Sequence, residues 1–103
     1  MGIAQDFDIT KNIRLIEMLK NQLLTNIADL YTNLSAEDAN LIERKELLSD
    51  LIIITYMLSN RLGFSHSSID IRAVKKLRLG ILDEKQSMYA DTASLLRHLS
   101  RNV

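Results

Sequence analysis

The stretch ERKELLSDLIIITYMLSNRLG, residues 43–63, decides the fold of this chain. Three acidic residues, Glu43, Glu46 and Asp50, lead into a nearly uninterrupted apolar segment that ends at Gly63. Their spacings of three and four residues place the three carboxylates along one edge of an α-helix. Carboxylates beside an apolar surface are costly unless a positive group lies against them. The stretch therefore predicts a helix whose acidic edge meets either basic side chains or a hard divalent cation.

The composition predicts an all-α protein. The chain has 103 residues, the size of about one small domain. It contains no proline and only 3 glycines, and it is rich in Leu, Ile, Ala, Glu, Lys and Arg. These residues favour helix in almost every window. We expect residues 1–103 to form a single helical domain.

Charge and cysteine content narrow the classes of function. The 13 basic residues balance the 13 acidic ones, so no overall field attracts nucleic acid or an anionic membrane. The absence of cysteine excludes disulfides, thiol catalysis and zinc-thiolate sites, and it suits a reducing cytosol. The first residues, MGIAQDFDIT, lack a secretory signal. The longest apolar run, 51–58, falls short of the roughly 20 residues of a spanning helix. We expect a soluble, cytoplasmic protein that binds neither membranes nor nucleic acid.

An amphipathic pattern before this stretch predicts one long helix over about residues 10–34, with Asp8 and Thr10 as candidate N-caps. Its apolar residues recur every three or four positions: Ile13, Ile16, Leu19, Leu23, Ile27, Leu30 and Leu34. A second line on the same helix is polar: Gln22, Asn26, Asp29 and Asn33. Asn and Asp are mediocre helix formers. This line is therefore either a solvated face or a polar strip that hydrogen-bonds a ligand or partner.

The next helix is predicted to start near Ala36, because Ser35 and Asp38 form an approximate capping box. With about one residue between the two helices, we expect a long antiparallel hairpin. The segment 51–58, LIIITYML, is apolar nearly all round and needs cover on several sides. The pattern therefore predicts an oligomer with this helix near the subunit interface. Gly63 is expected to take the left-handed position that ends the helix.

Two shorter helices are predicted to follow. Ser65 is a candidate cap for a helix over about 66–79, which Gly80 would end. After a polar turn at 83–87, a final helix is expected over 91–101. The first of these helices is rich in basic residues: Arg72, Lys75, Lys76 and Arg78. They can neutralise phosphates or form an ordinary solvated face.

No other pattern of catalytic chemistry stands out. A Gly-rich phosphate loop, a serine triad and zinc-ligand spacing are all missing from the sequence. His66 and His98 are single and far apart, so we expect them on loops and the surface. The acidic edge itself has an ordinary alternative, a helix face with ion pairs at i,i+4.

Three segments together resemble the short MazG-like proteins, relatives of the all-α nucleoside triphosphate pyrophosphohydrolases. They are ITKNIRLIEMLKNQLLTNIADLY (9–31), LLSDLIIITYMLSNRLGFS (47–65) and IDIRAVKKLRLGI (69–81). The resemblance implies a helical homodimer or homotetramer whose site lies between the two long helices. It also implies magnesium-dependent hydrolysis between the α- and β-phosphates of a nucleotide.

The resemblance also suggests where a metal site would lie. Active members carry Glu-x-x-Glu on the first long helix and Glu-x-x-Asp on the second, and these residues hold the metal. Asn26 and Asp29 fall at the first pair here, and Leu47 and Asp50 at the second, so two of the four carboxylates are replaced. The candidate Mg²⁺ ligands are Asp29, Glu43, Glu46 and Asp50. The candidate nucleotide- or phosphate-binding residues are Gln22, Asn26, Arg72, Lys75 and Lys76. No catalytic residue is singled out.

Three functions remain open from the sequence. The first is a magnesium-dependent pyrophosphohydrolase with a degenerate metal site. The second is a non-catalytic protein that binds or sequesters a nucleotide or a nucleotide-derived ligand. The third is a helical interaction module that docks another protein through the apolar half of its second long helix.

Overall fold

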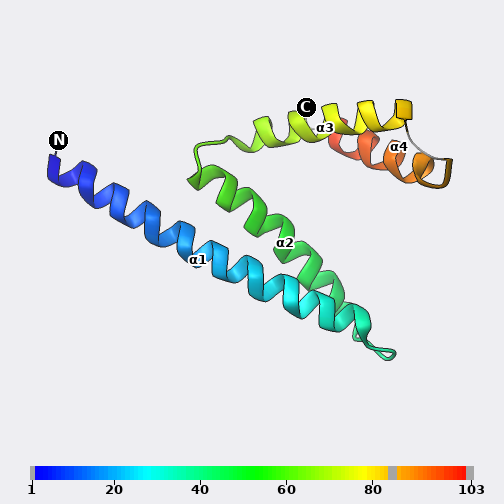
Figure 1. Cartoon of the computed structure of the whole chain (residues 1–103), viewed down its shortest axis with the longest axis horizontal. Helices are drawn as coiled ribbons and strands as arrows, with labels where there is room; N and C mark the ends of the chain where they lie inside the picture. Colours follow the sequence, from blue (N-terminus) through cyan, green and yellow to red (C-terminus); the bar gives the residue numbers. More distant parts are fainter. Residues whose placement is uncertain (1, 84–85, 102–103) are drawn as a thin grey trace. The chain divides into compact units, whose positions relative to one another are not determined.

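The computed structural model describes residues 2–83 and 86–101. Its four helices are α1 (Gly2–Ser35), α2 (Leu41–Arg61), α3 (His66–Asp83) and α4 (Gln86–Ser100) (Figure 1). Those described residues include no strand, which confirms the all-α prediction. The helices form two compact units, Met1–Gly63 and Phe64–Val103, which are taken in turn below.

The predicted start of α2 is wrong, because a different residue caps the helix. Asn40 Oδ1 accepts hydrogen bonds from the backbone N–H groups of Ile42 (3.0 Å) and Glu43 (3.2 Å). Asparagine is among the best N-cap residues. Ser35 Oγ instead donates to the carbonyl oxygen of Tyr31 (2.9 Å) inside α1, so it caps nothing. The link between the two helices is therefore longer than predicted.

The other end of α2 follows the sequence prediction. The helix ends at Arg61, and Leu62 is its C-cap. Gly63 follows with φ 97°, in the left-handed region that glycine adopts at little cost. The N–H of Gly63 donates to the carbonyl oxygen of Asn60 (3.1 Å), which satisfies one of the last carbonyls of the helix.

A cluster of side chains fixes α2 against α1 beside the link. The buried Asn33 of α1 donates from Nδ2 to the carbonyl oxygen of Asn40 (3.1 Å). Arg44 of α2 donates from Nε to Asn33 Oδ1 (2.7 Å) and from Nη2 to the Asn33 carbonyl oxygen (3.2 Å). Both polar ends of the Asn33 side chain are therefore paired, and the first turn of α2 is tied to α1.

A second contact ties the far end of α2 to α1, and together the two contacts set the register. Asn12 Nδ2 donates to the carbonyl oxygen of Arg61 (3.1 Å). The two contacts are the same distance apart on each helix, residues 12 to 33 on α1 and 40 to 61 on α2. The helices therefore run antiparallel, and α2 returns alongside α1 (Figure 1).

We call the line along which α1 and α2 meet the seam. Moving seven residues inward from each of these two contacts gives the next positions that face each other along it. One step inward from Asn12 and Arg61 brings Leu19 opposite Ile54, which are buried with 2% and 8% exposure. The next step brings Asn26 to the part of α2 that holds Leu47 and Asp50, which line the same groove as Asn26. Of the four seam positions on α1, three hold asparagine, so this seam is unusually polar for a contact between two helices.

Many apolar side chains of this unit stay exposed. The predicted apolar line of α1 is only partly buried, because Ile13, Ile27 and Leu34 remain 47–56% exposed. On α2, Ile52 and Ile53 are 60% and 53% exposed. The described unit therefore leaves the apolar half of α2 largely uncovered.

In the second unit, α3 packs on α4 around Val74, which is 3% exposed. Ser65 caps α3 as predicted, since its Oγ accepts from the N–H of Ser68 (3.1 Å). Gly80 does not end α3, which continues to Asp83, because a single glycine inside a helix costs only about 1 kcal/mol. The predicted start of α4 at residue 91 is also wrong, because the helix already begins at Gln86. Residues 84 and 85 of the predicted polar turn lie outside the described residues.

The predicted start of α1 near residue 10 is wrong as well. The helix begins at Gly2. No proline lies in this segment, so nothing in the backbone stops the helix from extending toward the N-terminus.

We predict that Asn33→Leu destabilises the protein by about 1–3 kcal/mol, because it removes the two side-chain hydrogen bonds that Asn33 makes with the Asn40 carbonyl oxygen and with Arg44 Nε. Urea unfolding followed by circular dichroism measures the change. Asn21→Leu, the same exchange at an exposed position of α1, serves as the control and is expected to change stability by less than about 0.5 kcal/mol. Equal stability of the two variants would contradict the assigned role of Asn33.

Candidate functional site

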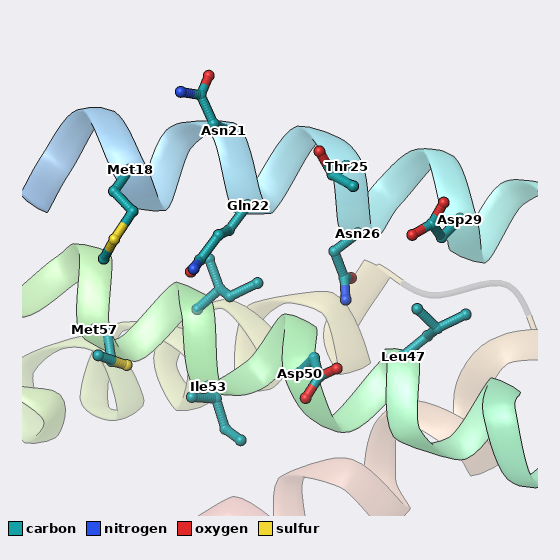
Figure 2. A pocket seen from close by; sticks show the side chains of 11 residues that line it. Met18, Asn21, Gln22, Thr25, Asn26, Asp29, Leu47, Asp50, Ile53 and Met57 are labelled. Carbon is teal, nitrogen blue, oxygen red and sulfur yellow. The ribbon is translucent and has the colours of Figure 1, made fainter.

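A groove of about 620 Å³ lies between α1 and α2 (Figure 2). From α1 it is lined by Met18, Asn21, Gln22, Thr25, Asn26 and Asp29, and from α2 by Leu47, Asp50, Ile53, Ile54 and Met57. Met18 and Met57 lie at one end, and Asp29 and Leu47 at the other (Figure 2). The groove therefore runs from an apolar end to an acidic end.

The charges of the groove are all negative. Asp29 and Asp50 are its charged lining residues, one from each helix, and no lysine or arginine lines it within the described part of the chain. Both aspartates are exposed to solvent. An anionic ligand on its own is repelled by such a groove, whereas a cation, or an anion bound together with a cation, is attracted.

Asn26 is the buried polar residue of the groove. It is 7% exposed, and its Oδ1 is buried without any hydrogen-bond partner. Figure 2 shows its side chain pointing from α1 toward α2. Figure 2 shows Asp50 below Asn26 on α2, and Leu47 further toward Asp29. An ionised carboxylate only accepts hydrogen bonds and leucine has no polar side-chain atom, so neither residue donates to Oδ1. A buried acceptor without a partner costs about 1–3 kcal/mol.

The predicted polar line of α1 divides into two environments. Asn26 and Asn33 are buried against α2, whereas Gln22 and Asp29 are exposed at the groove. The line is therefore neither a solvated face nor a uniform strip. The heptad spacing that Asn26 and Asn33 share with Asn12 and Leu19 is the sequence signal that marks the seam.

Two of the predicted metal ligands lie away from this groove. Glu43 lines a neighbouring hollow of about 300 Å³ beside the link, together with Asp29, Asn33 and Asn40. Glu46 is exposed and lines neither of these hollows. The structure therefore brings Gln22, Asn26, Asp29 and Asp50 to one groove, and places Glu43 next to it.

The predicted phosphate-binding cations belong to α3 in the second unit. Arg72, Lys75 and Lys76 are all exposed. Lys76 also lines a largely apolar hollow of about 340 Å³ between α3 and α4. His66 and His98 are exposed, as the sequence predicted, but they lie in α3 and α4 rather than in loops.

Comparison with known proteins identifies the family. The sequence model of the MazG-like family matches residues 9–91, most of the chain. The chain belongs to the MazG-like family. This membership points to the nucleotide pyrophosphohydrolase superfamily. No curated protein and no solved structure gave a significant match.

The groove of this MazG-like chain is lined by the four residues at which the sequence resemblance placed the metal-binding motif: Asn26, Asp29, Leu47 and Asp50. Two are carboxylates, one is an amide, and one is apolar. Glu46 was a candidate ligand from the sequence. It precedes Leu47, however, and its side chain points roughly 100° away from that of Leu47 around the helix axis.

The carboxylates of the groove fit magnesium only in part. Within residues 2–83 and 86–101, no three His, Asp or Glu side chains lie close enough together to hold a metal ion. Asp29 and Asp50 nevertheless suit Mg²⁺, because this ion binds through one or two carboxylates and completes its shell with water and substrate phosphates. When bound, magnesium neutralises phosphate charge and activates water.

Membrane insertion was considered separately. Among the helices described here, none is by itself long and apolar enough to cross a bilayer.

We predict that the double substitution Asn26→Glu with Leu47→Glu creates strong magnesium dependence. Two facing carboxylates in the seam repel each other, so the metal-free variant is less stable than the parent protein, and Mg²⁺ restores its stability. Melting temperatures in Mg²⁺ and in EDTA measure the effect.

A matched control adds the same charge away from the groove. Leu24→Glu with Leu48→Glu changes two exposed positions that do not line it. If the two double variants respond equally to Mg²⁺, residues 26 and 47 do not face each other across the groove.

Proposed function

We propose that this MazG-like protein binds a nucleotide, or a ligand derived from one, together with Mg²⁺ in the groove between α1 and α2. The observation that carries the proposal is the lining of the groove, where Asp29 and Asp50 face an otherwise uncharged surface. Phosphates fit such a lining only when a cation accompanies them. Family membership supports a nucleotide as the source of those phosphates.

In this proposal each residue has a limited task. Asp29 and Asp50 are exposed, so they hold a hydrated ion at small desolvation cost and orient the phosphates that share it. Gln22 offers an amide one helical turn from Asn26. Glu43 and Glu46 contribute negative potential near the ion rather than direct ligands.

The proposal favours binding over rapid turnover. Hydrolysis between the α- and β-phosphates needs an ion that is held firmly enough to polarise the phosphate and activate water. Leu47 and Asn26 remove two of the four charges that the family uses for this task. Slow pyrophosphohydrolase activity is the second candidate. It is favoured by Asp50, which falls at the aspartate of the Glu-x-x-Asp pair.

The oligomer completes the proposal. Arg72, Lys75 and Lys76 are exposed cations of the second unit, and their role in binding phosphate stays a prediction from the sequence. Leu41, Leu48 and Ile52 form an apolar face of α2, 47–70% exposed, which we propose is covered in a homodimer or homotetramer. A cytoplasmic location, where nucleotides and Mg²⁺ are plentiful, belongs to the same proposal.

We predict that nucleoside triphosphates raise the melting temperature in Mg²⁺ but not in EDTA. At a ligand concentration of 100 Kd the stabilisation is about 2.7 kcal/mol. Asp50→Asn keeps the shape of the side chain but removes its charge, and is expected to abolish most of the shift. Asp38→Asn, an exposed position in the link, is the control.

The same samples are assayed for released pyrophosphate. Stabilisation without pyrophosphate identifies a binding or sequestering protein, and stabilisation with slow release identifies the enzyme. No shift with any nucleotide would overturn the proposal and favour a protein-interaction module.

We predict that the protein is oligomeric and that Ile52→Glu shifts it toward the monomer, because the substitution places a charge in a covered apolar face. Light scattering coupled to size-exclusion chromatography measures the mass. Leu79→Glu, an equally exposed position of α3, is the control and is expected to leave the mass unchanged. A monomeric parent protein would contradict this part of the proposal.

A further inference from the structure

The proposed function assigns no role to one buried residue of the groove, Asn26. Asn26 is buried and its Oδ1 has no partner, although the same residue type at the neighbouring heptad position, Asn33, has both polar ends paired. The two asparagines are equally buried, each with 7% exposure. Burial alone therefore does not explain why Asn26 lacks a partner. The difference lies in the neighbours of each side chain on α2: Asn33 has a donor in Arg44, whereas Asn26 has Asp50 and Leu47, which donate no hydrogen bond.

We propose that Asn26 is a specificity-determining residue that hydrogen-bonds an uncharged edge of the nucleoside part of the ligand. The proposal rests on the proposed function, since it assumes that a nucleotide enters this groove. An amide presents an acceptor and a donor side by side, and this pattern matches the edges of nucleobases. Asn26 already lines the groove, and rotation about its Cβ–Cγ bond changes which of Oδ1 and Nδ2 faces a ligand there.

The surroundings of Asn26 favour an uncharged group over a second cation. Leu47 and Ile54 line the same groove, and Ile54 is almost fully buried. Magnesium dehydrates reluctantly and keeps several waters, which apolar walls cannot hydrogen-bond. The exposed Asp29 and Asp50 offer a hydrated ion a better position. A planar ring with polar edges suits an amide beside apolar side chains.

The groove also has a suitable place for the face of such a ring. Met18 and Met57 lie at its apolar end and are 44% and 50% exposed. Methionine side chains are flexible and polarizable, so they adapt to a ring that packs on them. Met18 and Asp29 are eleven residues apart on α1, which spans about 16 Å along a helix. Asn26 lies about 12 Å from Met18 and about 4.5 Å from Asp29 along the helix, so the part of the nucleoside that it reaches is the part next to the phosphates, and the ring extends from there toward the methionines.

The proposal predicts opposite effects of one substitution on stability and on binding. Asn26→Leu removes an unpaired buried acceptor and adds an apolar side chain to the groove that Leu47 also lines, so the melting temperature should rise by several degrees. The same substitution removes the contact with the nucleoside, so affinity for Mg²⁺-nucleotide should fall roughly tenfold. A residue that serves only the fold would not show both effects.

The experiment compares nucleotides with a base-free ligand. Titration calorimetry measures the Kd of the four common nucleoside triphosphates and of inorganic tripolyphosphate, all in Mg²⁺, for the parent protein and for Asn26→Leu. Tripolyphosphate engages the ion but presents no nucleoside, so its Kd should be the same for both proteins. Asn26→Ala is a second variant, in case leucine does not fit the seam.

The outcomes separate this proposal from the proposed function. A parent protein that binds neither nucleotides nor tripolyphosphate overturns the proposed function. A parent protein that binds nucleotides with an affinity that both Asn26 variants retain overturns the role of Asn26 alone. Equal weakening of tripolyphosphate and nucleotide also overturns it, because Asn26 would then act on the metal and its phosphates.

Discussion

The register between α1 and α2 is the constraint on which the rest of this structure depends. It is set at one end by Asn33, which binds the Asn40 carbonyl and the Arg44 guanidinium, and at the other by Asn12, which binds the Arg61 carbonyl. These bonds are directional, so they select one alignment where apolar contacts alone would tolerate sliding. Asn26, Asp29, Leu47 and Asp50 line one groove because this alignment holds.

A polar seam changes how the first unit is stabilised. Leu19 and Ile54 form a small apolar contact in the middle, and asparagines occupy the other seam positions of α1. Much of the apolar surface therefore lies on the outer faces of both helices, where it is available to other chains. Such a unit has less internal hydrophobic stabilisation, and it has instead a ligand groove and an apolar surface suited to assembly. The unpaired Asn26 amide fits this picture, since functional groups are often retained at a cost in stability.

The sequence predicted the fold class and several helix ends, but not the chemistry of the seam. Ser65 and Gly63 act as predicted because a cap and a left-handed turn depend on local backbone geometry. Ser35 and Gly80 were misjudged because each has a competitor that local rules do not weigh. Asn40 forms the better cap, and tertiary packing between α3 and α4 outweighs the cost of one internal glycine.

The candidate site was predicted in part for a similar reason. Asp29, Asp50, Gln22 and Asn26 were identified and do line one groove. Glu43 and Glu46 lie on the same edge of α2 as Asp50 by their spacing, but they do not line the groove. The spacing shows which residues share an edge of one helix, and it does not show which edge meets the partner helix. Which edge meets the partner helix depends on the register between the two helices. Asparagines spaced by seven residues specify this register, and a pattern of apolar residues alone does not reveal it.

The most direct test of this account is a double-mutant cycle between Asn26→Leu and Leu47→Gln, measured as free energies of unfolding in urea. If the two side chains face each other, Leu47→Gln gives the Asn26 amide a partner and costs little. In the Asn26→Leu background the same glutamine is unpaired and destabilises the protein. The account therefore predicts a coupling energy of about 0.5–3 kcal/mol between the two sites. Additive effects would show that residues 26 and 47 do not meet, and would contradict the register on which the groove and its proposed function depend.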